Sequence, residues 1–279
     1  MRGSEPSRSA MSAAVARGIH RLWDDPPWIL DDPFALPLVG EEWQAFAEQS
    51  TALSRPPHQA RSGVLVRTRY AEDVLAADAY AQYVILGAGL DSFAWRHPEF
   101  LANGRVLEVD HPATQTWKRE RARTLALPDS ARHVFAPADL ARDALASCLT
   151  AAGFDWTAPA LLSCVGTTMY LDAGTIAALL RTVARCAPGS AIVLSYNPRV
   201  ELLDEIQRAF LERVSRLVAG MGEPLRSAFT PDEIVRLAHD AGLRAAAAPT
   251  HDELEERYLT TRRDGMRLLM IERLLWLRV

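Results

Sequence analysis

Hydrophobic and polar positions follow two different patterns along the chain, and the change comes near residue 80. From Gln82 onward, five short runs of apolar or β-branched residues are each bounded by Gly, Pro, Asn or Asp, which is typical of buried strands. Amphipathic stretches separate some of these runs, and the one at 171–189 repeats apolar residues at helical spacing. The alternation predicts βαβ units, and therefore an α/β fold with a doubly wound, mostly parallel sheet. The predicted strands are 82–89, 104–110, 132–139, 158–166 and 189–197.

The first eighty residues contain helix-like stretches and no convincing strand. Val15, Ile19 and Leu22 fall on one face of a predicted helix over 12–23. Residues 24–34 are rich in proline and form a predicted connector, because proline removes a donor and disfavours the helical region for the residue before it. A second helix is predicted to begin after Pro57.

After the fifth strand, apolar residues return at helical spacing over 200–219, which predicts an inserted helix that covers a site. Its predicted apolar face is Leu203, Ile206, Phe210, Val214 and Leu217. A helix that opens at Thr230 and strand-like runs at 243–249 and 267–279 would complete a seven-stranded sheet. We therefore expect one domain over 1–279, with a helical extension or lid at 1–56, a ligand-binding core at 57–198, the inserted lid helix at 199–229 and sheet completion at 230–279.

Composition and charge exclude several classes of protein. The chain has 279 residues, 49% of them hydrophobic, and a net charge of −4 without a basic stripe, so nucleic acid is not an expected partner. No apolar run approaches the roughly 20 residues of a membrane span. The three cysteines form no C-x-x-C pair, which predicts neither a metal cluster nor a disulfide framework and fits a reducing cytoplasm.

The first predicted strand runs into a glycine loop, Gly87-Ala88-Gly89, where a doubly wound sheet binds its ligand. Asp110 ends the next strand, 21 positions after Gly89, where an acid that holds a nucleotide ribose is expected. A purely structural interpretation is that the glycines form a tight turn and Asp110 caps the following helix. The glycine loop and the acid together favour a nucleotide-type ligand.

The residues after the loop distinguish between ligands. Dinucleotide loops prefer G-x-G-x-x-G/A, but the third position here is Ser92, and Asp91 would place negative charge beside a pyrophosphate. S-adenosylmethionine has no phosphate and carries a sulfonium cation, so the local chemistry favours it over NAD. Asp139, after the third strand, could bond the adenine amino group while Leu140 covers the ring; the alternative is a helix N-cap.

At this point the sequence resembles the leucine carboxyl methyltransferase family and its bacterial and polyketide carboxyl O-methyltransferase relatives of the tetracenomycin type. The resemblance rests on "VRTRYAEDVL", "VILGAGLDSFAWR", "LEVDHP", "ADL", "VGTTMYL" and "RYLTTRRDGM". It implies a class I methyltransferase fold with a helical extension and a lid over the acceptor pocket. It also implies that Arg67 binds the carboxylate of the cofactor and that Gly87 lies in its loop, with Asp110 on the ribose and Asp139 and Leu140 on the adenine.

One position departs from the family pattern. Many members carry a cofactor-contacting glutamate five residues before the tyrosine of the Y-L pair, where this chain has Val165 before Tyr170. The departure disfavours the protein-phosphatase-methylating branch and favours a small-molecule acceptor.

The acceptor is predicted from the chemistry of methyl transfer. A carboxylate, with a pKa near 4, is already ionised at neutral pH and needs no general base, whereas a phenol with a pKa near 10 would need one. The histidines form no catalytic pattern; His20, in the predicted lid helix, is a candidate for acceptor binding, and His111 lies beside Asp110. Tyr170, Tyr196 and Arg262 are further candidates for acceptor binding, against packing tyrosines and a salt bridge of Arg262 or Arg263 with Asp264.

The leading hypothesis is therefore an S-adenosylmethionine-dependent O-methyltransferase that acts on the carboxylate of a small natural product or of a peptide C-terminus. The alternatives are a phenol or alcohol O-methyltransferase, a cofactor-binding relative that acts as a cyclase or interaction module, and, more remotely, a nicotinamide oxidoreductase. The sequence leaves the oligomeric state open.

Overall fold

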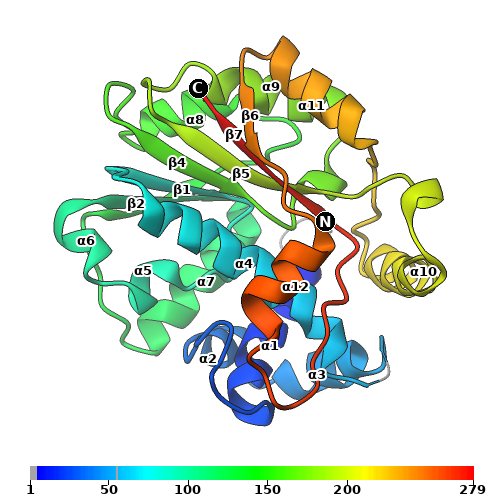
Figure 1. Ribbon diagram of the computed structural model, residues 1–279. Coiled ribbons are helices and arrows are strands. Elements are labelled where there is room, and N and C mark those ends of the chain that lie inside the picture. Colours follow the sequence, from blue (N-terminus) through cyan, green and yellow to red (C-terminus); the bar gives the residue numbers. More distant parts are fainter. Residues whose placement is uncertain (1–4, 55) are drawn as a thin grey trace.

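The apolar runs from Gln82 onward form the strands that the sequence predicts. In the computed structural model, which describes residues 5–54 and 56–279, they belong to one seven-stranded sheet in the order β3-β2-β1-β4-β5-β7-β6 (Figure 1). The pairs among β1 to β5 are parallel, and β7 runs antiparallel to both of its neighbours. The predicted doubly wound, mostly parallel sheet is confirmed. The strands are β1 (Gln82–Leu86), β2 (Arg105–Asp110), β3 (His133–Pro137), β4 (Ala160–Cys164), β5 (Ala191–Tyr196), β6 (Arg244–Ala247) and β7 (Arg273–Arg278).

Helices cover both faces of the sheet because the strands are apolar on both sides. One core packs β1, β2, β4 and β5 against α8 (Leu145–Ala151), α9 (Ala173–Val183) and α11 (Pro231–Asp240). The opposite core packs the sheet against α4 (Gln59–Ala77), α5 (Phe93–Arg96) and α12 (His251–Leu259). The remaining helical elements of the core are α6 (Phe100–Asn103), α7 (Pro112–Thr124) and the 3₁₀ turns η1 (Thr168–Tyr170) and η2 (Val200–Leu202).

The N-terminal helices form a separate layer below the sheet in Figure 1. They are α1 (Arg8–Trp23), α2 (Ala35–Val39) and α3 (Trp43–Thr51), and their shared core includes Val15, Ile19 and Phe46. Leu90, just after the glycine loop, belongs to the same core, so this layer is attached to the loop. The predicted apolar face of the first helix is wrong at Leu22, which is 58% exposed.

The inserted helix is present, and its apolar face agrees with the predicted one except at Leu203 and Ile206. The helix α10 (Glu205–Gly220) begins after Asp204, which caps it together with Gln207, so Leu203 lies outside the helix. Ile206 is 71% exposed. Phe210, Val214 and Leu217 lie on the inner face as predicted, and Leu211 and Val218 lie there with them.

No helix among the described residues is long and apolar enough to cross a bilayer.

Candidate functional site

The register of the sheet brings the glycine loop and Asp110 to one edge. Leu86 pairs with Val109 in parallel strands, so Gly87 and Asp110 emerge side by side at the carboxyl ends of β1 and β2. The N–H groups of Gly87 and Ala88 both donate to Val109 O, at 2.8 and 3.2 Å, which pins the loop to β2.

Both glycines of the loop are required by their conformation and by their neighbours. Gly87 has φ +71°, and a Cβ there would lie 2.2 Å from Thr167 Oγ1. Gly89 has φ +52°, and a Cβ there would lie 2.8 Å from the Cβ of Ala10 in α1. The loop is therefore bare partly because α1 and the segment after β4 pack directly on it.

Asp110 is oriented by two backbone donors. Its Oδ2 accepts from Gly89 N and its Oδ1 from His111 N, both at 2.6 Å. A carboxylate has about four acceptor positions, so each oxygen keeps capacity for a ligand hydroxyl, as a ribose requires. Burial raises the pKa of Asp110 to about 6, against the opposing effect of these two bonds. Asp110 is not the helix cap, because His111 occupies the N-cap of α7 and accepts from Ala113 N.

Asp139 and Leu140 follow β3 at the same edge. Asp139 Oδ1 accepts from Ala141 N at 3.0 Å, which stabilises a turn rather than a helix. The interpretation of Asp139 as a helix N-cap is wrong, since α8 begins only at Leu145 and its N-cap is Ala144.

Arg67 reaches the same edge from α4 and is an ion-pair partner rather than a solvated surface arginine. Its Nη1 lies 2.5 Å from Oε1 of Glu272, and the two side chains are 15% and 10% exposed. Ser195 Oγ donates to the same Oε1 at 3.2 Å and accepts from Gly166 N at 2.7 Å. A Cβ on Gly166, which has φ +73°, would lie 2.4 Å from Arg67 Nη2, so this glycine leaves room for the guanidinium.

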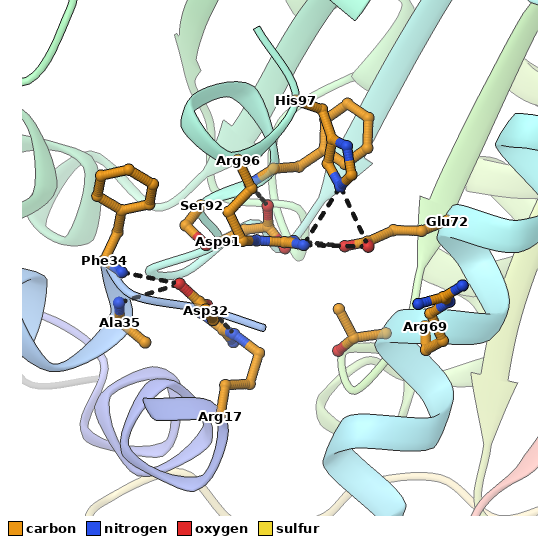
Figure 2. Close-up of polar contacts among 12 residues, drawn as sticks. Arg17, Asp32, Phe34, Ala35, Arg69, Glu72, Asp91, Ser92, Arg96 and His97 are labelled. Carbon is orange, nitrogen blue, oxygen red and sulfur yellow. Dashed lines mark hydrogen bonds and ion pairs between the residues drawn. The ribbon is translucent and has the colours of Figure 1, made fainter. Parts of the chain in front are cut away.

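A polar network attaches α1 to the segment that follows the glycine loop (Figure 2). Arg17 donates to Asp32 Oδ2 at 2.9 Å and to Leu90 O at 2.7 Å. Asp32 in turn accepts from Phe34 N and Ala35 N, at 3.2 and 3.1 Å. Burial alone would raise the pKa of Asp32, but the nearby guanidinium groups, chiefly that of Arg17, hold it below its ordinary value. The connector before α2 is thereby fixed against the loop.

Further along the same segment, Arg96 joins α5 to α4. Its Nε donates to Ser92 Oγ at 2.9 Å, and its two terminal nitrogens donate to the carboxylate of Glu72 (Figure 2). His97 Nε2 lies 3.6 Å from Glu72 Oε2, and this contact contributes to a raised pKa of His97. The buried ion pairs of Arg17 with Asp32 and of Arg96 with Glu72 therefore hold the segment that follows the glycine loop.

These elements enclose one cavity of about 810 Å³, a volume within the usual range for cofactor and small-molecule sites. Its polar end is lined by the predicted cofactor residues Arg67, Gly87, Ala88, Gly89, Asp110, Asp139 and Leu140. The hydrophobic lining residues Leu53, Val64, Phe210, Leu211, Val214, Leu269 and Ile271, most of which pack in one cluster, form the part of the wall that we call its apolar end.

A carboxylate joins the two segments that cover the cavity, the start of α1 and the residues after α10. Glu223, in the segment after α10, accepts from the hydroxyls of Ser7 and Ser9 at 2.9 and 2.5 Å and from Arg8 N at 2.9 Å. These donors lie at the start of α1, where an acid also complements the helix dipole. Tyr170 lines the cavity beside this contact, and burial raises its pKa.

Three of the predicted acceptor-binding residues do not line the cavity. His20 is fully buried between Asp24, 2.6 Å from its Nδ1, and Ile29 N, which donates to its Nε2 at 3.0 Å. Burial lowers the pKa of His20, and because Nε2 accepts a hydrogen bond, the ring is the neutral Nδ1–H tautomer and both nitrogens are occupied.

Arg262 and Tyr196 are also directed elsewhere. Arg262 pairs with Asp264, as the salt-bridge alternative predicts, and donates to Pro27 O at 2.8 Å. Tyr196 packs into the core on the α9 side of β5, while the next residue, Asn197, lines the cavity. The sequence places Tyr196 at the correct strand end but does not fix which face its side chain takes.

Sequence reasoning missed Arg17, Glu223 and Glu272, which all line the cavity. Glu272 had a detectable signal, since it is a single acid inside the apolar run before the last strand. Arg17 and Glu223 had none, because their partners are distant in sequence. Among the described residues, no group of three or more potential ligands is arranged to hold a metal ion.

The sheet order with a reversed β7, a glycine loop after β1 and acids after β2 and β3 defines the class I S-adenosylmethionine-dependent methyltransferases. Solved structures agree on this fold: a DUF574 family protein from Streptomyces avermitilis has a TM-score of 0.64 at 17% identity and covers 99% of this chain and 98% of its own. A methyltransferase structure from Thermobifida fusca has a TM-score of 0.63 at 17% identity, with 99% and 96% covered.

The chain belongs to the leucine carboxyl methyltransferase family, whose sequence model matches residues 10–184. It is 30% identical over 292 residues to YktD of Bacillus subtilis (strain 168), which is named as an S-adenosyl-L-methionine-dependent methyltransferase, with 95% of each chain covered. A similarly named protein of Frankia alni is 36% identical over 208 residues, with 70% of this chain and 71% of that protein covered. The protein is thus a methyltransferase that uses S-adenosylmethionine, and the tetracenomycin-type branch stays a prediction.

Proposed function

We propose that the protein is an O-methyltransferase that methylates the carboxylate of a small natural product, or of a peptide C-terminus. In this proposal Gly87, Ala88, Gly89 and Asp110 hold the donor at the polar end of the cavity, with Asp139 and Leu140 at its adenine and Arg67 at its carboxylate. The acceptor occupies the apolar end, between α4 and the inner face of α10.

The character of the acceptor end carries the proposal. Among the described residues that line the cavity, the one histidine is His111, which is engaged as the N-cap of α7 beside Asp110. The apolar end therefore offers a surface for a hydrophobic acceptor body and no histidine base. A carboxylate, ionised at neutral pH, is the oxygen nucleophile that can react there without one.

The donor supplies a methyl group activated by its sulfonium. The chain contributes by aligning the acceptor with the methyl group of the donor and by excluding water. Hydrophobic side chains on the inner face of α10 contact the acceptor, the N-terminal layer closes over the glycine loop, and the Glu223 contact joins these two covers. Holding the reactants in line at near-attack distance supplies most of the rate that such a displacement needs.

The test uses S-adenosylmethionine with a labelled methyl group and matched acceptor pairs, each a hydrophobic carboxylic acid and the phenol of the same skeleton. We expect label transfer to the acids, into a product that mild alkali hydrolyses with release of labelled methanol. Methyl ethers formed from phenols resist the same treatment, so the two products are distinguished chemically.

Alkali-stable product from the phenols, with none from the acids, would refute the carboxylate assignment and support a phenol methyltransferase. Peptides with free and amidated C-termini, assayed alongside, separate a peptide acceptor from a small molecule.

A further inference from the structure

The ion pair of Arg67 and Glu272 lies in the wall of the cavity and joins two distant parts of the chain. Arg67 comes from α4, and Glu272 directly precedes β7, 205 positions later. Glu272 also lies beyond residues 10–184, the part that the family model matches. Nothing in the family match therefore assigns a role to it.

The pair keeps one oxygen available to a ligand. The hydrogen bonds from Arg67 and Ser195 both fall on Oε1, and no described residue donates to Oε2 of Glu272. Glu272 and Arg67 line the same cavity, together with Val165 and Gly166. Oε2 of Glu272 has no donor, and Nη2 of Arg67 lies against Gly166, which has no side chain. The negative charge of Glu272 and the positive charge of Arg67 can therefore both contact a ligand at this end of the cavity.

The charge pattern matches a zwitterionic amino acid. An α-amino acid carries its ammonium and its carboxylate on the same carbon atom, and each is held best by a group of opposite charge. Against Arg67 and Glu272, the four charges would alternate in sign, and binding would leave the local net charge at zero. A partly buried ion pair tolerates such a ligand, because neither charge loses its compensation.

We propose that Glu272 binds the α-ammonium group of the donor's amino-acid end, beside the carboxylate held by Arg67. Directly after β4 this wall is formed by Val165 and Gly166, and neither of these two residues supplies an acid. Glu272 supplies the carboxylate from the β7 side of the sheet.

The test measures ligand binding by calorimetry and does not depend on the acceptor. The ligands are S-adenosylhomocysteine, its deaminated analogue, its decarboxylated analogue, and 5′-methylthioadenosine, which lacks both charged groups. Glu272→Gln keeps the size of the side chain and the acceptor for Arg67 but removes the charge. We expect about 10- to 100-fold weaker binding of the two ligands that carry the ammonium, because charge-assisted hydrogen bonds are the stronger ones. The deaminated analogue and methylthioadenosine should bind both proteins equally.

Two further variants make the result decisive. Glu223→Gln removes a different carboxylate from the same cavity, and we expect it to change the affinity of all four ligands by one common factor. Asp91 also lines the cavity under the glycine loop and forms no ion pair among the described residues. If Asp91→Asn, and not Glu272→Gln, selectively weakens the ammonium-bearing ligands, the proposal is wrong and the ammonium lies at Asp91. Equal losses for all four ligands in Glu272→Gln would also overturn it, since they would indicate a purely structural ion pair.

Discussion

Substitution of Gly89 by alanine measures how closely α1 packs on the cofactor loop. Gly89 has φ +52°, and its added Cβ would lie 2.8 Å from the Cβ of Ala10. The left-handed backbone costs an alanine about 1–2 kcal/mol, and forcing a methyl group into a packed contact costs about 1–3 kcal/mol more. We therefore expect Gly89→Ala to lower the free energy of unfolding by about 2–5 kcal/mol in total.

Gly265 provides the matched control, because it has φ +73° and no atom within 4 Å of its added Cβ. Gly265→Ala should lose only the backbone share, about 1–2 kcal/mol. Urea unfolding gives both free energies, with the slope showing whether the transition stays comparable.

A second substitution isolates the steric part. Ala10→Gly removes the methyl group that the new alanine at position 89 would meet. In a double-mutant cycle of these two positions we expect a coupling of about 1–3 kcal/mol, in the direction of rescue. If Gly89→Ala costs no more than Gly265→Ala and the cycle shows no coupling, α1 does not rest on the loop and the stated reason for Gly89 is wrong.

Three further predictions concern charged groups. Burial raises the pKa of Asp110 to about 6, so affinity for S-adenosylhomocysteine should fall as pH drops below that value, by at most about tenfold per pH unit. Asp110→Asn should make the affinity independent of pH in this range. A pH profile unchanged by that variant would exclude Asp110 as the titrating group. Between about pH 4 and 6 the folded protein keeps the Asp110 proton that the unfolded chain has already lost, so the contribution of this group to stability falls as pH rises. Protonation of Asp110 therefore does not unfold the protein, and unfolding cannot be the cause of the lower affinity at low pH. Glu223→Ala removes the acceptor for three donors at the start of α1 and should speed dissociation of S-adenosylhomocysteine in stopped-flow measurements, whereas an unchanged rate would show that the contact does not restrain release. Lys118→Met leaves the buried Glu108 with His133 as its remaining partner and should lower the free energy of unfolding by up to about 3–5 kcal/mol. Glu108→Gln in the same chain removes the uncompensated charge but keeps an acceptor for His133, and it should restore part of this loss. A Lys118→Met variant as stable as the parent would contradict this.

The local pattern of the sequence was sufficient for the sheet. Runs such as 82–89 and 104–110 are mostly apolar and end in glycine or aspartate, which is typical of interior parallel strands. Their carboxyl ends meet at one edge, so the glycine loop, Asp110 and Asp139 could be assigned to one ligand site before any contact was known.

The acceptor side could not be predicted in the same way. The period of the lid helix predicts three of its cavity-lining residues, Phe210, Val214 and Leu217, but it does not show where the helix begins, and the predicted face wrongly includes Ile206. Tyr196 and Asn197 illustrate the same limit at a strand end, where neighbouring residues take opposite faces.

The sequence by itself therefore determined the fold, the methyl donor and the residues that follow strands β1, β2 and β3, because these depend on short-range patterns and on the fixed geometry of parallel strands. Only the tertiary structure decided which distant side chains meet. In the folded chain His20 and Arg262 form buried structural contacts, and Ala10 lies against Gly89. Arg67 forms an ion pair with Glu272, 205 positions later in the sequence. Such pairs depend on how whole layers dock, and burial makes each pairing selective because an unpaired charge in the interior is costly.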